Sequence, residues 1–513
     1  MKLSPRSPIF YLNIFFVLLP VVFFPLSGDL SVFWQGAKCI LDGGTIYKDW
    51  IDIKPPLIYY LLAGVRFIFG SSEMSVRLFD FLYQFIAAIF LARVAERILK
   101  TEWIGAMSGI FYSITYVTQS YSNTAQVETM IALPMVGVMY FHLYGGKKFI
   151  NYALLGLLVG IIVGFKFTFL PFIIAFPIDD ILAKRLNSKE LLKKYLIIIL
   201  GFLLGLFLSF LPFLDSEIRS NFALVLEFLT GYASFDVFSA GYFSFFYKQN
   251  SAHWGDLYSL AFTYFVIIGL LNSFKKSFKN EIFFVFLLAV GMFLSVALEK
   301  RYLPYHFQRM HIPLALIGAF GFSCLFNYLK ENWSKKLYNR VINYLIILLL
   351  LVVSPIVRVI GIWQFPVAYL IDRNKYNNLK YDPESTSNLR PEYLDIAEYL
   401  NDSINEKSFV MMVNTGGCLT HHYLATDQIT GFAQPYFHFN DLDIQEWRAK
   451  FEEEIRSADW LVIQTNDVWM IKNGKWYTSQ EMISSIPELQ SYISDKFIFE
   501  KEIGNFRILK RNE

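Results

Sequence analysis

The stretch Gly28–Arg77 reads GDLSVFWQGAKCILDGGTIYKDWIDIKPPLIYYLLAGVRFIFGSSEMSVR and follows an apolar run that ends near Leu26. It mixes acidic and basic side chains with Gly-Gly and Pro-Pro pairs, which an ordinary connection between membrane spans does not need. Asp29 stands three residues after the apolar run, where the chain is expected to leave the membrane. A carboxylate at that level can act as a base, or hold a metal, where a lipid head group meets an aqueous substrate.

The composition is that of a polytopic α-helical membrane protein. Of the 513 residues, 55% are hydrophobic and only 17% are charged, whereas soluble proteins carry about 25% charged residues. The net charge of +3 is too small to indicate nucleic-acid binding, and the basic residues fall in short loops where membrane topology explains them. The three cysteines match no metal-ligand spacing.

Apolar runs of about 20 residues predict membrane spans. Eleven runs qualify: 9–26, 74–92, 103–119, 127–145, 149–165, 167–183, 195–214, 257–273, 281–298, 311–327 and 343–360. Lys2 and Arg6 precede the first run, and every second connection is basic, so the N-terminus is expected in the cytoplasm and the C-terminus outside. The run Pro56–Phe69 is short and contains Arg66, and we interpret it as a helix on the outer membrane surface.

The composition changes after about residue 365, where segments become short, mixed and charged. We predict a membrane core of residues 1–365, with a catalytic outer loop 27–73, and a small extracytoplasmic α/β domain of residues 366–513. Within the latter the pattern predicts helices at 391–404 and 443–457, strands at 408–413 and 459–465, and a closing strand pair. This segment contains no Gly-rich phosphate-binding loop, so a nucleotide site is not expected there.

On the outer side, this topology gathers charged groups that are costly at membrane depth and are therefore functional candidates. Asp29 and Glu128 are the candidate catalytic acids. The candidate contacts to a donor phosphate or head group are Lys54, Arg77, Lys166, Arg301, His306 and Arg309. Structural alternatives stay open for each, because a glutamate can cap a helix, a lysine can extend to the interface and arginines can bind anionic lipid.

Acids beside cations suit a reaction that needs a base and has a phosphate leaving group. A carboxylate can take the proton of an attacking hydroxyl, and Lys, Arg and His can stabilise the departing phosphate in a water-poor site. Alternatively, Asp29 and Glu128 hold a divalent cation such as Mg²⁺ or Mn²⁺. The sequence does not distinguish a metal-free reaction from a metal-dependent one, so the cofactor stays open.

The order of residues in the first loop resembles a known family. Asp29 is followed by Ala37, Leu41, Gly43, Gly44 and Tyr47, then by Lys54, Pro55, Pro56, Leu57 and Tyr59, then by Gly70 and Arg77. This pattern resembles the GT-C membrane glycosyltransferases, in the branch of the protein O-mannosyltransferases and the lipid A aminoarabinose transferases. The Gly-rich run that ends at Lys166 and the segment RYLPYHFQRMHIP around His306 also resemble family segments.

The resemblance implies a glycosyltransferase that takes its sugar from a polyprenyl-phosphate carrier, with Asp29 as the acid–base residue of the first outer loop. Two positions depart from the family pattern. Leu30 follows Asp29 where many relatives carry a second acid, and Glu128 stands where many have Asp.

We therefore predict a transferase that moves a single sugar from a polyprenyl-phosphate-linked donor to a lipid, glycan or protein acceptor. Membrane lipids are its other expected partners, and its expected place is a bacterial inner (plasma) membrane. Two alternatives stay open: a flippase or transporter of lipid-linked glycans, and a ligase or polymerase of whole glycans that uses the long loop 215–256. No residue identifies the sugar or the acceptor.

Overall fold

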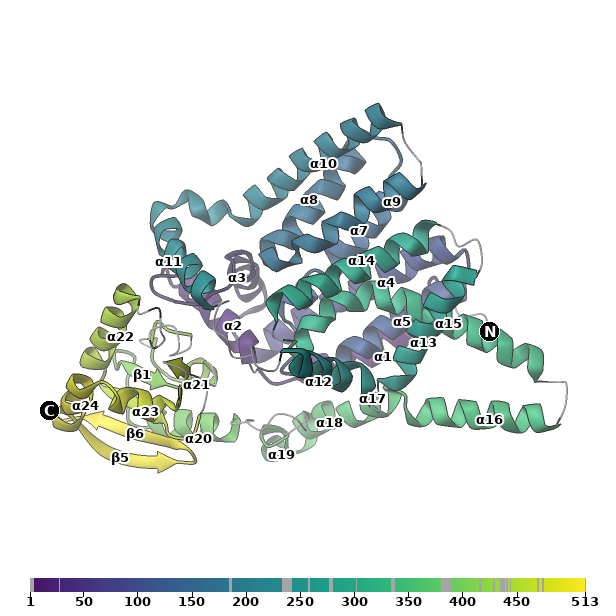
Figure 1. The fold of residues 1–513 in the computed structure, drawn as a ribbon. Helices are drawn as coiled ribbons and strands as arrows, with labels where there is room; N and C mark the ends of the chain where they lie inside the picture. Colours follow the sequence, from purple (N-terminus) through teal and green to yellow (C-terminus); the bar gives the residue numbers. More distant parts are fainter. Residues whose placement is uncertain are drawn as a thin grey trace. The chain divides into compact units, whose positions relative to one another are not determined.

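The chain folds into two compact units in the computed structural model (Figure 1). The helical unit comprises Met1–Pro25, Ser72–Leu211 and Val237–Arg373, and the α/β unit comprises Leu26–Ser71, Pro212–Asp236 and Asn374–Glu513. The structure describes residues 4–26, 28–183, 187–232, 242–256, 259–275, 280–300, 302–333, 337–379, 390–414, 418–427, 430–433, 439, 442, 444–467, 470–472 and 475–512.

The helical unit is built almost wholly from apolar helices. In chain order these are α1 (Pro8–Leu18), η1 (Leu19–Phe23), α4 (Glu73–Leu99), α5 (Glu102–Val117), α6 (Val127–Met130), α7 (Ala132–Tyr144), α8 (Phe149–Phe165), η2 (Phe167–Ile174), α9 (Ala175–Ala183), α10 (Ser188–Ser209), α12 (Tyr242–Gly255), α13 (Leu260–Lys275), α14 (Asn280–Glu299), η5 (Pro304–Met310), α15 (His311–Asn332), α16 (Leu337–Val352), α17 (Ile356–Ile362) and α18 (Gln364–Ile371).

Among the described residues, six helical stretches are long and apolar enough to cross a membrane, or up to eight if each of two bent pairs is one span. The six are Glu73–Leu99, Val127–Tyr144, Ser188–Ser209, Glu281–Glu299, Pro304–Asn332 and Asn339–Ile371, and each overlaps a predicted span. The prediction of eleven spans is not reproduced in number. Helices α5 and α8 have only 16 and 17 residues, and the run 167–183 is broken between η2, which contains Pro171, and α9.

Helices α8 and α10 run side by side at very short distance (Figure 1). Glycines spaced by four residues line both helices: Gly156 and Gly160 on α8, and Gly201 and Gly205 on α10. A Cβ atom added at any of them would overlap a backbone carbonyl oxygen of the other helix. Small residues at this spacing allow membrane helices to approach closely, and here they fix the helix that leads to Lys166.

The α/β unit contains a mixed four-stranded sheet of strand order β1-β2-β6-β5. Strand β1 (Val410–Val413) pairs parallel with β2 (Trp460–Gln464), and β6 (Phe506–Arg511) pairs antiparallel with both β2 and β5 (Phe497–Ile503). Its remaining elements are α2 (Gly28–Leu41), α3 (Leu57–Phe69), α11 (Ser216–Tyr232), α20 (Arg390–Asn401), α21 (Leu419–Tyr423), α22 (Gln445–Ser457), β3 (Met470–Lys472), β4 (Lys475–Tyr477), α23 (Ser479–Ser484) and α24 (Pro487–Lys496).

These elements confirm the predicted small α/β fold of the C-terminal segment. Helices α20 and α22 and strands β1 and β2 lie where the sequence pattern places them, and β5 and β6 form the predicted closing pair. The short elements α19 (Arg373–Asn377) and η3 (Leu211–Leu214) lie at the borders of the units. The long loop 215–256 contains α11 and α12, and its residues 233–241 lie outside the described part.

Backbone hydrogen bonds join the first loop to the C-terminal segment within the α/β unit. The Ile51 N–H donates to the Gly431 carbonyl at 2.6 Å, and the Ala433 N–H donates to the Ile51 carbonyl at 3.0 Å. The Lys450 ammonium donates to the Lys48 carbonyl. The sequence-based division places loop 27–73 with the membrane core, whereas in the structure residues 26–71 fold together with residues 374–513.

Candidate active site

Asp29 lies in the first turn of α2, not in an irregular loop. A carboxylate is favourable at a helix N-terminus because the exposed N–H groups there carry partial positive charge. The turn is closed by the Ser31 hydroxyl, which donates to the Gly28 carbonyl at 2.7 Å. The Asp29 side chain is 27% exposed, so a substrate hydroxyl can reach it.

Lys54 is the cation next to Asp29. Its Nζ atom lies 3.6 Å from Oδ2 of Asp29, and its side chain is 18% exposed. The Tyr47 hydroxyl donates to the Lys54 carbonyl at 2.8 Å, which fixes the backbone at this point. Pro55 and Pro56 follow, and α3 begins at Leu57, so the Lys-Pro-Pro segment is a short rigid entry into a helix.

The structure adds Asp52, a charged residue of the first loop for which no role in the site was predicted. Asp52 is buried, accepts a hydrogen bond from the Tyr59 hydroxyl, and accepts another from the Ile53 N–H at 2.7 Å. Burial raises the pKa of Asp52 above its usual value, while the charge of Lys54 acts in the opposite direction. Asp52 could have been predicted from the sequence Asp-Ile-Lys, because it places an acid two residues before the candidate lysine Lys54.

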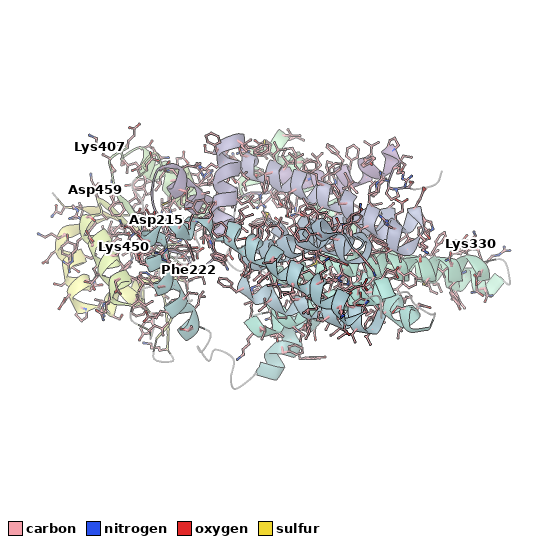
Figure 2. The ribbon with its side chains drawn as sticks, turned by 90° about the horizontal axis from the view of Figure 1, so that it is seen from above. Asp215, Phe222, Lys330, Lys407, Lys450 and Asp459 are labelled. Atoms are coloured by element: carbon pink, nitrogen blue, oxygen red, sulfur yellow. The ribbon has the colours of Figure 1, made fainter. Side chains whose placement is uncertain are left out.

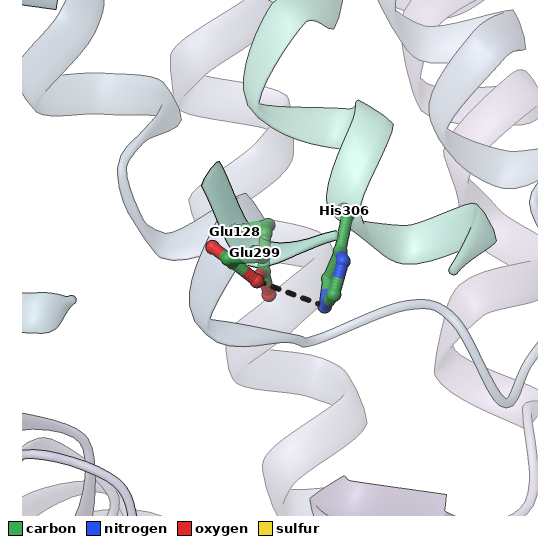
Figure 3. A group of neighbouring side chains, drawn as sticks. All are labelled: Glu128, Glu299 and His306. Atoms are coloured by element: carbon green, nitrogen blue, oxygen red, sulfur yellow. Dashed lines mark ion pairs between the residues drawn. The ribbon is translucent and has the colours of Figure 1, made fainter. Parts of the chain in front are cut away.

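In the helical unit, a second cluster forms around Glu128, which is buried, and Glu299, which is partly buried (Figure 3). Glu128 lies in α6, Glu299 is the last residue of α14, and His306 and Arg309 lie in η5. Lys166 lies between α8 and η2 and bridges both acids, with Nζ 2.8 Å from Glu128 and 2.7 Å from Glu299. The cluster therefore joins segments that are far apart in the sequence.

Arg309 completes the charge balance of this cluster. Its guanidinium lies 2.9 Å from Glu128 and 2.8 Å from Glu299, and it is stacked over the Phe169 ring at 4.6 Å. His306 Nε2 lies 3.2 Å from Glu299. Arg309 is fully buried, whereas the Lys166 side chain keeps 14% of its surface exposed. Lys166 is thus the cation of this cluster that a head group can reach.

Glu128, Glu299 and His306 also have the composition of a metal site. Their ligand atoms lie within 4.8 Å of one another, and two carboxylates with an imidazole suit Zn²⁺ or Mn²⁺. However, Lys166 and Arg309 already neutralise the two acids. A divalent ion would add two positive charges to a cluster whose acids are already paired. The residues therefore have suitable ligand atoms for a metal ion, but the charge balance favours metal binding only if Lys166 moves away.

A third buried cluster lies at the other end of α7. His142 Nε2 is 2.8 Å from Asp179, and Lys194 Nζ is 2.6 Å from Asp180. The Tyr195 hydroxyl donates to Asp180 at 2.8 Å. These contacts join α7, α9 and α10, and the sequence analysis did not anticipate them because the residues lie within or beside apolar runs.

Arg77 and Arg301 complete the list of predicted contacts. Arg77 is fully buried, and it donates to the carbonyl of Pro25 at 2.6 Å, to the carbonyl of Tyr121 at 3.0 Å and to the Thr124 hydroxyl at 2.9 Å. This geometry favours a structural role for Arg77 rather than a head-group contact. Arg301 lies outside the described residues.

The predicted residues thus form two groups, one in each unit. Asp29 and Lys54, with Asp52, belong to the α/β unit, while Glu128, Lys166, His306 and Arg309, with Glu299, belong to the helical unit. Glu299 belongs to the charged outer groups expected from the sequence, but no role in the site was predicted for it. Its signal was an acid directly after the apolar run 281–298, at membrane depth.

Solved structures of known proteins share this fold. ArnT from Cupriavidus metallidurans bound to undecaprenyl phosphate is 12% identical, with a TM-score of 0.55 over 97% of this chain and 96% of that chain. The apo state of the same protein gives a TM-score of 0.56 with the same identity and coverage. The chain has a GT-C fold. An oligosaccharyltransferase of Archaeoglobus fulgidus in complex with Zn and sulfate is 11% identical, with a TM-score of 0.47 over 88% of this chain and 68% of that chain.

A family model agrees with the GT-C fold. Residues 53–214 match the dolichyl-phosphate-mannose-protein mannosyltransferase family. This segment includes Lys54, Glu128 and Lys166. No curated protein matches the chain at a significant level. The resemblance to the GT-C membrane glycosyltransferases, first indicated by the Gly28–Arg77 stretch, is confirmed.

Proposed function

We propose that this chain transfers one sugar from a polyprenyl-phosphate-linked donor to an acceptor hydroxyl at the outer face of the membrane. The observation that carries the proposal is the Asp29–Lys54 pair, a partly exposed carboxylate 3.6 Å from a partly exposed ammonium. The family match and the likeness to a protein crystallised with undecaprenyl phosphate support the lipid-linked donor. In this proposal, Asp29 as the base lies next to Lys54 as the cation that contacts the phosphate.

In the proposed reaction, Asp29 accepts the proton of the acceptor hydroxyl as its oxygen attacks the anomeric carbon of the sugar. A new glycosidic bond forms between that oxygen and the anomeric carbon. The bond between the anomeric carbon and the phosphate oxygen breaks, and its electron pair leaves with the polyprenyl phosphate. Lys54 stabilises the charge that develops on this phosphate, and Asp29 then releases its proton to water.

Asp52 and Tyr59 act as positioning residues in this proposal. Their hydrogen bond and the Ile53 N–H contact fix the segment that carries Lys54. Because a preorganised cation stabilises developing charge without first having to reorient, this rigidity favours the transition state.

The helical unit holds a separate candidate contact for an anionic head group. We propose that Lys166, whose side chain is partly exposed, contacts a lipid phosphate head group, while buried Arg309 keeps Glu128 and Glu299 in place. Glu128 is then an electrostatic partner of Lys166, or a metal ligand if Lys166 is displaced. His306 contacts Glu299 through Nε2.

The experiment that tests the proposal is mass spectrometry of envelope lipids and glycans from a deletion strain. The strain is complemented with wild type, Asp29→Asn or Asp42→Asn, at equal level in the membrane. Asp42 is a matched control because it is a carboxylate of the same helix–loop segment that is 55% exposed. We expect wild type and Asp42→Asn to restore one added sugar, and Asp29→Asn to reduce it by a factor of 10² or more, on the order expected for loss of a general base.

Full restoration by Asp29→Asn would overturn the assignment of the base. If wild type changes no lipid or glycan, the transferase proposal itself fails. A further assay separates transfer from transport: detergent-solubilised protein must consume a polyprenyl-phosphate-linked sugar, because a flippase leaves the sugar–phosphate bond intact.

A further inference from the structure

A cavity of about 670 Å³ lies in the helical unit between α5, α13, α15, α16 and α17. It contains none of the candidate active-site residues. Its wall is mostly apolar and aromatic, with Phe111, Phe265, Phe322 and Leu350 among its lining residues. Phe111 stacks on Phe265 at 5.7 Å and meets Phe322 edge-on at 5.7 Å, so the wall is a packed aromatic surface.

Helix α16, which forms one side of the cavity, is little covered by protein. In the most apolar stretch of Asn339–Ile371, only 11% is buried inside the protein. Leu348, Leu349 and Leu351 are 59%, 62% and 54% exposed. An apolar helix of this kind faces lipid in a membrane protein, so the cavity lies where a lipid chain can enter it from the bilayer.

One end of the cavity is basic. Lys330 and Trp333, at the C-terminal end of α15, line it, and Lys330 lies at the far end of the unit's helices (Figure 2). Arg340 of α16 donates from Nε to the Trp333 carbonyl at 3.2 Å, which places a second cation beside this end. Neither Lys330 nor Arg340 forms an ion pair with any residue that the structure describes.

The aromatic residues at this end are of the type found at the head-group level of membranes. Trp333 packs edge-on against Tyr344, with ring centroids 4.9 Å apart. Trp and Tyr are enriched at the membrane–water interface because their rings are apolar and carry one polar atom. The loop between α15 and α16 contains further lysines in the sequence, Lys335 and Lys336, and such basic loops lie in the cytoplasm by the positive-inside rule.

We propose that this cavity binds an anionic phospholipid of the cytoplasmic leaflet. One acyl chain fills the aromatic cavity, and the phosphate lies between Lys330 and Arg340. Basic pockets between transmembrane helices on the cytoplasmic side are suited to anionic head groups. The proposal is independent of the sugar-transfer reaction.

The position on α15 argues for a phospholipid rather than the sugar donor. The cluster of Glu128, His306 and Arg309 adjoins the N-terminal end of α15, while Lys330 lies near its C-terminal end. With 22 residues, α15 is about 33 Å long. A lipid phosphate at Lys330 is therefore roughly a membrane thickness away from the proposed head-group contact in the same unit.

The test is native mass spectrometry of the full-length protein in mild detergent, with phosphatidylglycerol or phosphatidylcholine added at equal concentration. The charge variant is Lys330→Gln/Arg340→Gln. The matched control is Lys189→Gln/Lys193→Gln, which removes two exposed cations from α10. Since each basic residue near a membrane surface contributes about a fivefold increase in anionic-lipid affinity, we expect roughly 30-fold weaker phosphatidylglycerol binding for the charge variant and no change for the control.

A second variant, Ile347→Trp, fills the cavity with a larger side chain from α16. We expect it to lower the binding of phosphatidylglycerol without changing the two cations. Equal retention of phosphatidylglycerol by wild type and the charge variant would overturn the proposal. So would equal binding of the two phospholipids by wild type, or displacement of phosphatidylglycerol by polyprenyl phosphate at this position.

Discussion

The Nζ atom of Lys54 lies 3.6 Å from Oδ2 of Asp29, although the two residues come from different segments of the first loop. Asp29 is in the first turn of α2, whereas Lys54 directly precedes the two prolines before α3. The pair is only partly buried, so its own ion-pair energy is small. In the proposed reaction, the pair presents a base and a cation to the same substrate.

Replacement of Lys54 by Met is expected to lower kcat/KM for the donor by about 10- to 100-fold, since a charged hydrogen bond contributes about 1.5–3 kcal/mol. Lys54→Arg keeps the charge and should retain part of the activity. Initial rates with detergent-solubilised protein and a polyprenyl-phosphate-linked sugar measure the effect. Lys48→Met is the control, because Lys48 is 51% exposed and pairs with Glu217. An unchanged kcat/KM for Lys54→Met would contradict the assigned role.

The buried cluster around Glu299 predicts strongly coupled stability effects. Lys166→Met leaves two buried acids with one cation fewer, and the expected loss of stability is about 3–5 kcal/mol. The double variant Lys166→Met/Glu299→Gln restores the charge balance and should lose clearly less than the sum of the single changes. Thermal unfolding of the solubilised protein measures all three. Strict additivity would show that the acids and Lys166 do not interact.

Metal dependence follows from the same charge balance. Because Lys166 and Arg309 neutralise Glu128 and Glu299, we expect chelation by EDTA to leave the activity of wild type unchanged. Lys166→Gln, in contrast, should raise the affinity for Mn²⁺ or Zn²⁺ by about tenfold or more, since it removes a competing cation. Metal content after dialysis reports this directly. Loss of wild-type activity in EDTA that Mn²⁺ restores would support the metal-bound version instead.

The contact between α8 and α10 predicts that its glycines are intolerant of side chains. Gly160→Leu or Gly201→Leu must separate two helices whose backbones touch, and we expect a loss of about 3 kcal/mol or failure to accumulate in the membrane. Gly64→Ala is the control, because a Cβ at Gly64 meets no atom within 4 Å. That change should be neutral or slightly stabilising. Equal tolerance at all three positions would be incompatible with the observed packing.

His421 predicts a pH dependence of the stability of the α/β unit. Burial lowers the pKa of His421 to about 3, well below the value of about 6.5 expected in the unfolded chain. Between these values the unfolded state binds the proton and the folded state does not, so stability falls as the pH falls below about 6.5. The expected loss is about 2 kcal/mol between pH 7 and pH 5.

The variant His421→Phe should lose this component of the pH dependence, because it keeps a ring of similar size without a titrating group. His422→Gln, at the neighbouring position of α21, should keep it. Melting temperatures of the full-length protein at pH 7 and pH 5 provide the comparison. A wild-type melting temperature that does not respond to pH would contradict the assignment.

Local pattern was enough to predict much of the fold. Membrane spans such as Glu73–Leu99 and Ser188–Ser209 follow from length and hydropathy alone, since a bilayer dictates both. Strands β1 and β2 followed from short apolar runs between amphipathic helices. The helix α2 was not anticipated, because its polar and glycine residues resemble those of a loop.

Long-range pairing could not be derived from the sequence. The predicted topology placed Glu128, Lys166, His306 and Arg309 on one side of the membrane, and the structure brings these four residues together. Nothing local in the sequence indicates that Lys166 bridges Glu128 and Glu299. Conversely, Arg77 looked like a head-group contact from its position. Only the structure shows that backbone carbonyls of Pro25 and Tyr121 occupy its donors.

The hydrogen bonds of Ile51 with Gly431 and Ala433 have a consequence for biosynthesis. Gly431 is made about 380 residues after Ile51, which at 5–20 residues per second is a delay of roughly 20–75 s. During that interval the segment with Asp29 and Lys54 lacks its backbone partner. The segment that carries the proposed base and cation, although it emerges first, therefore reaches its final form only when translation is nearly complete. A protein shortened before residue 431 would carry these groups without the backbone partner that holds them.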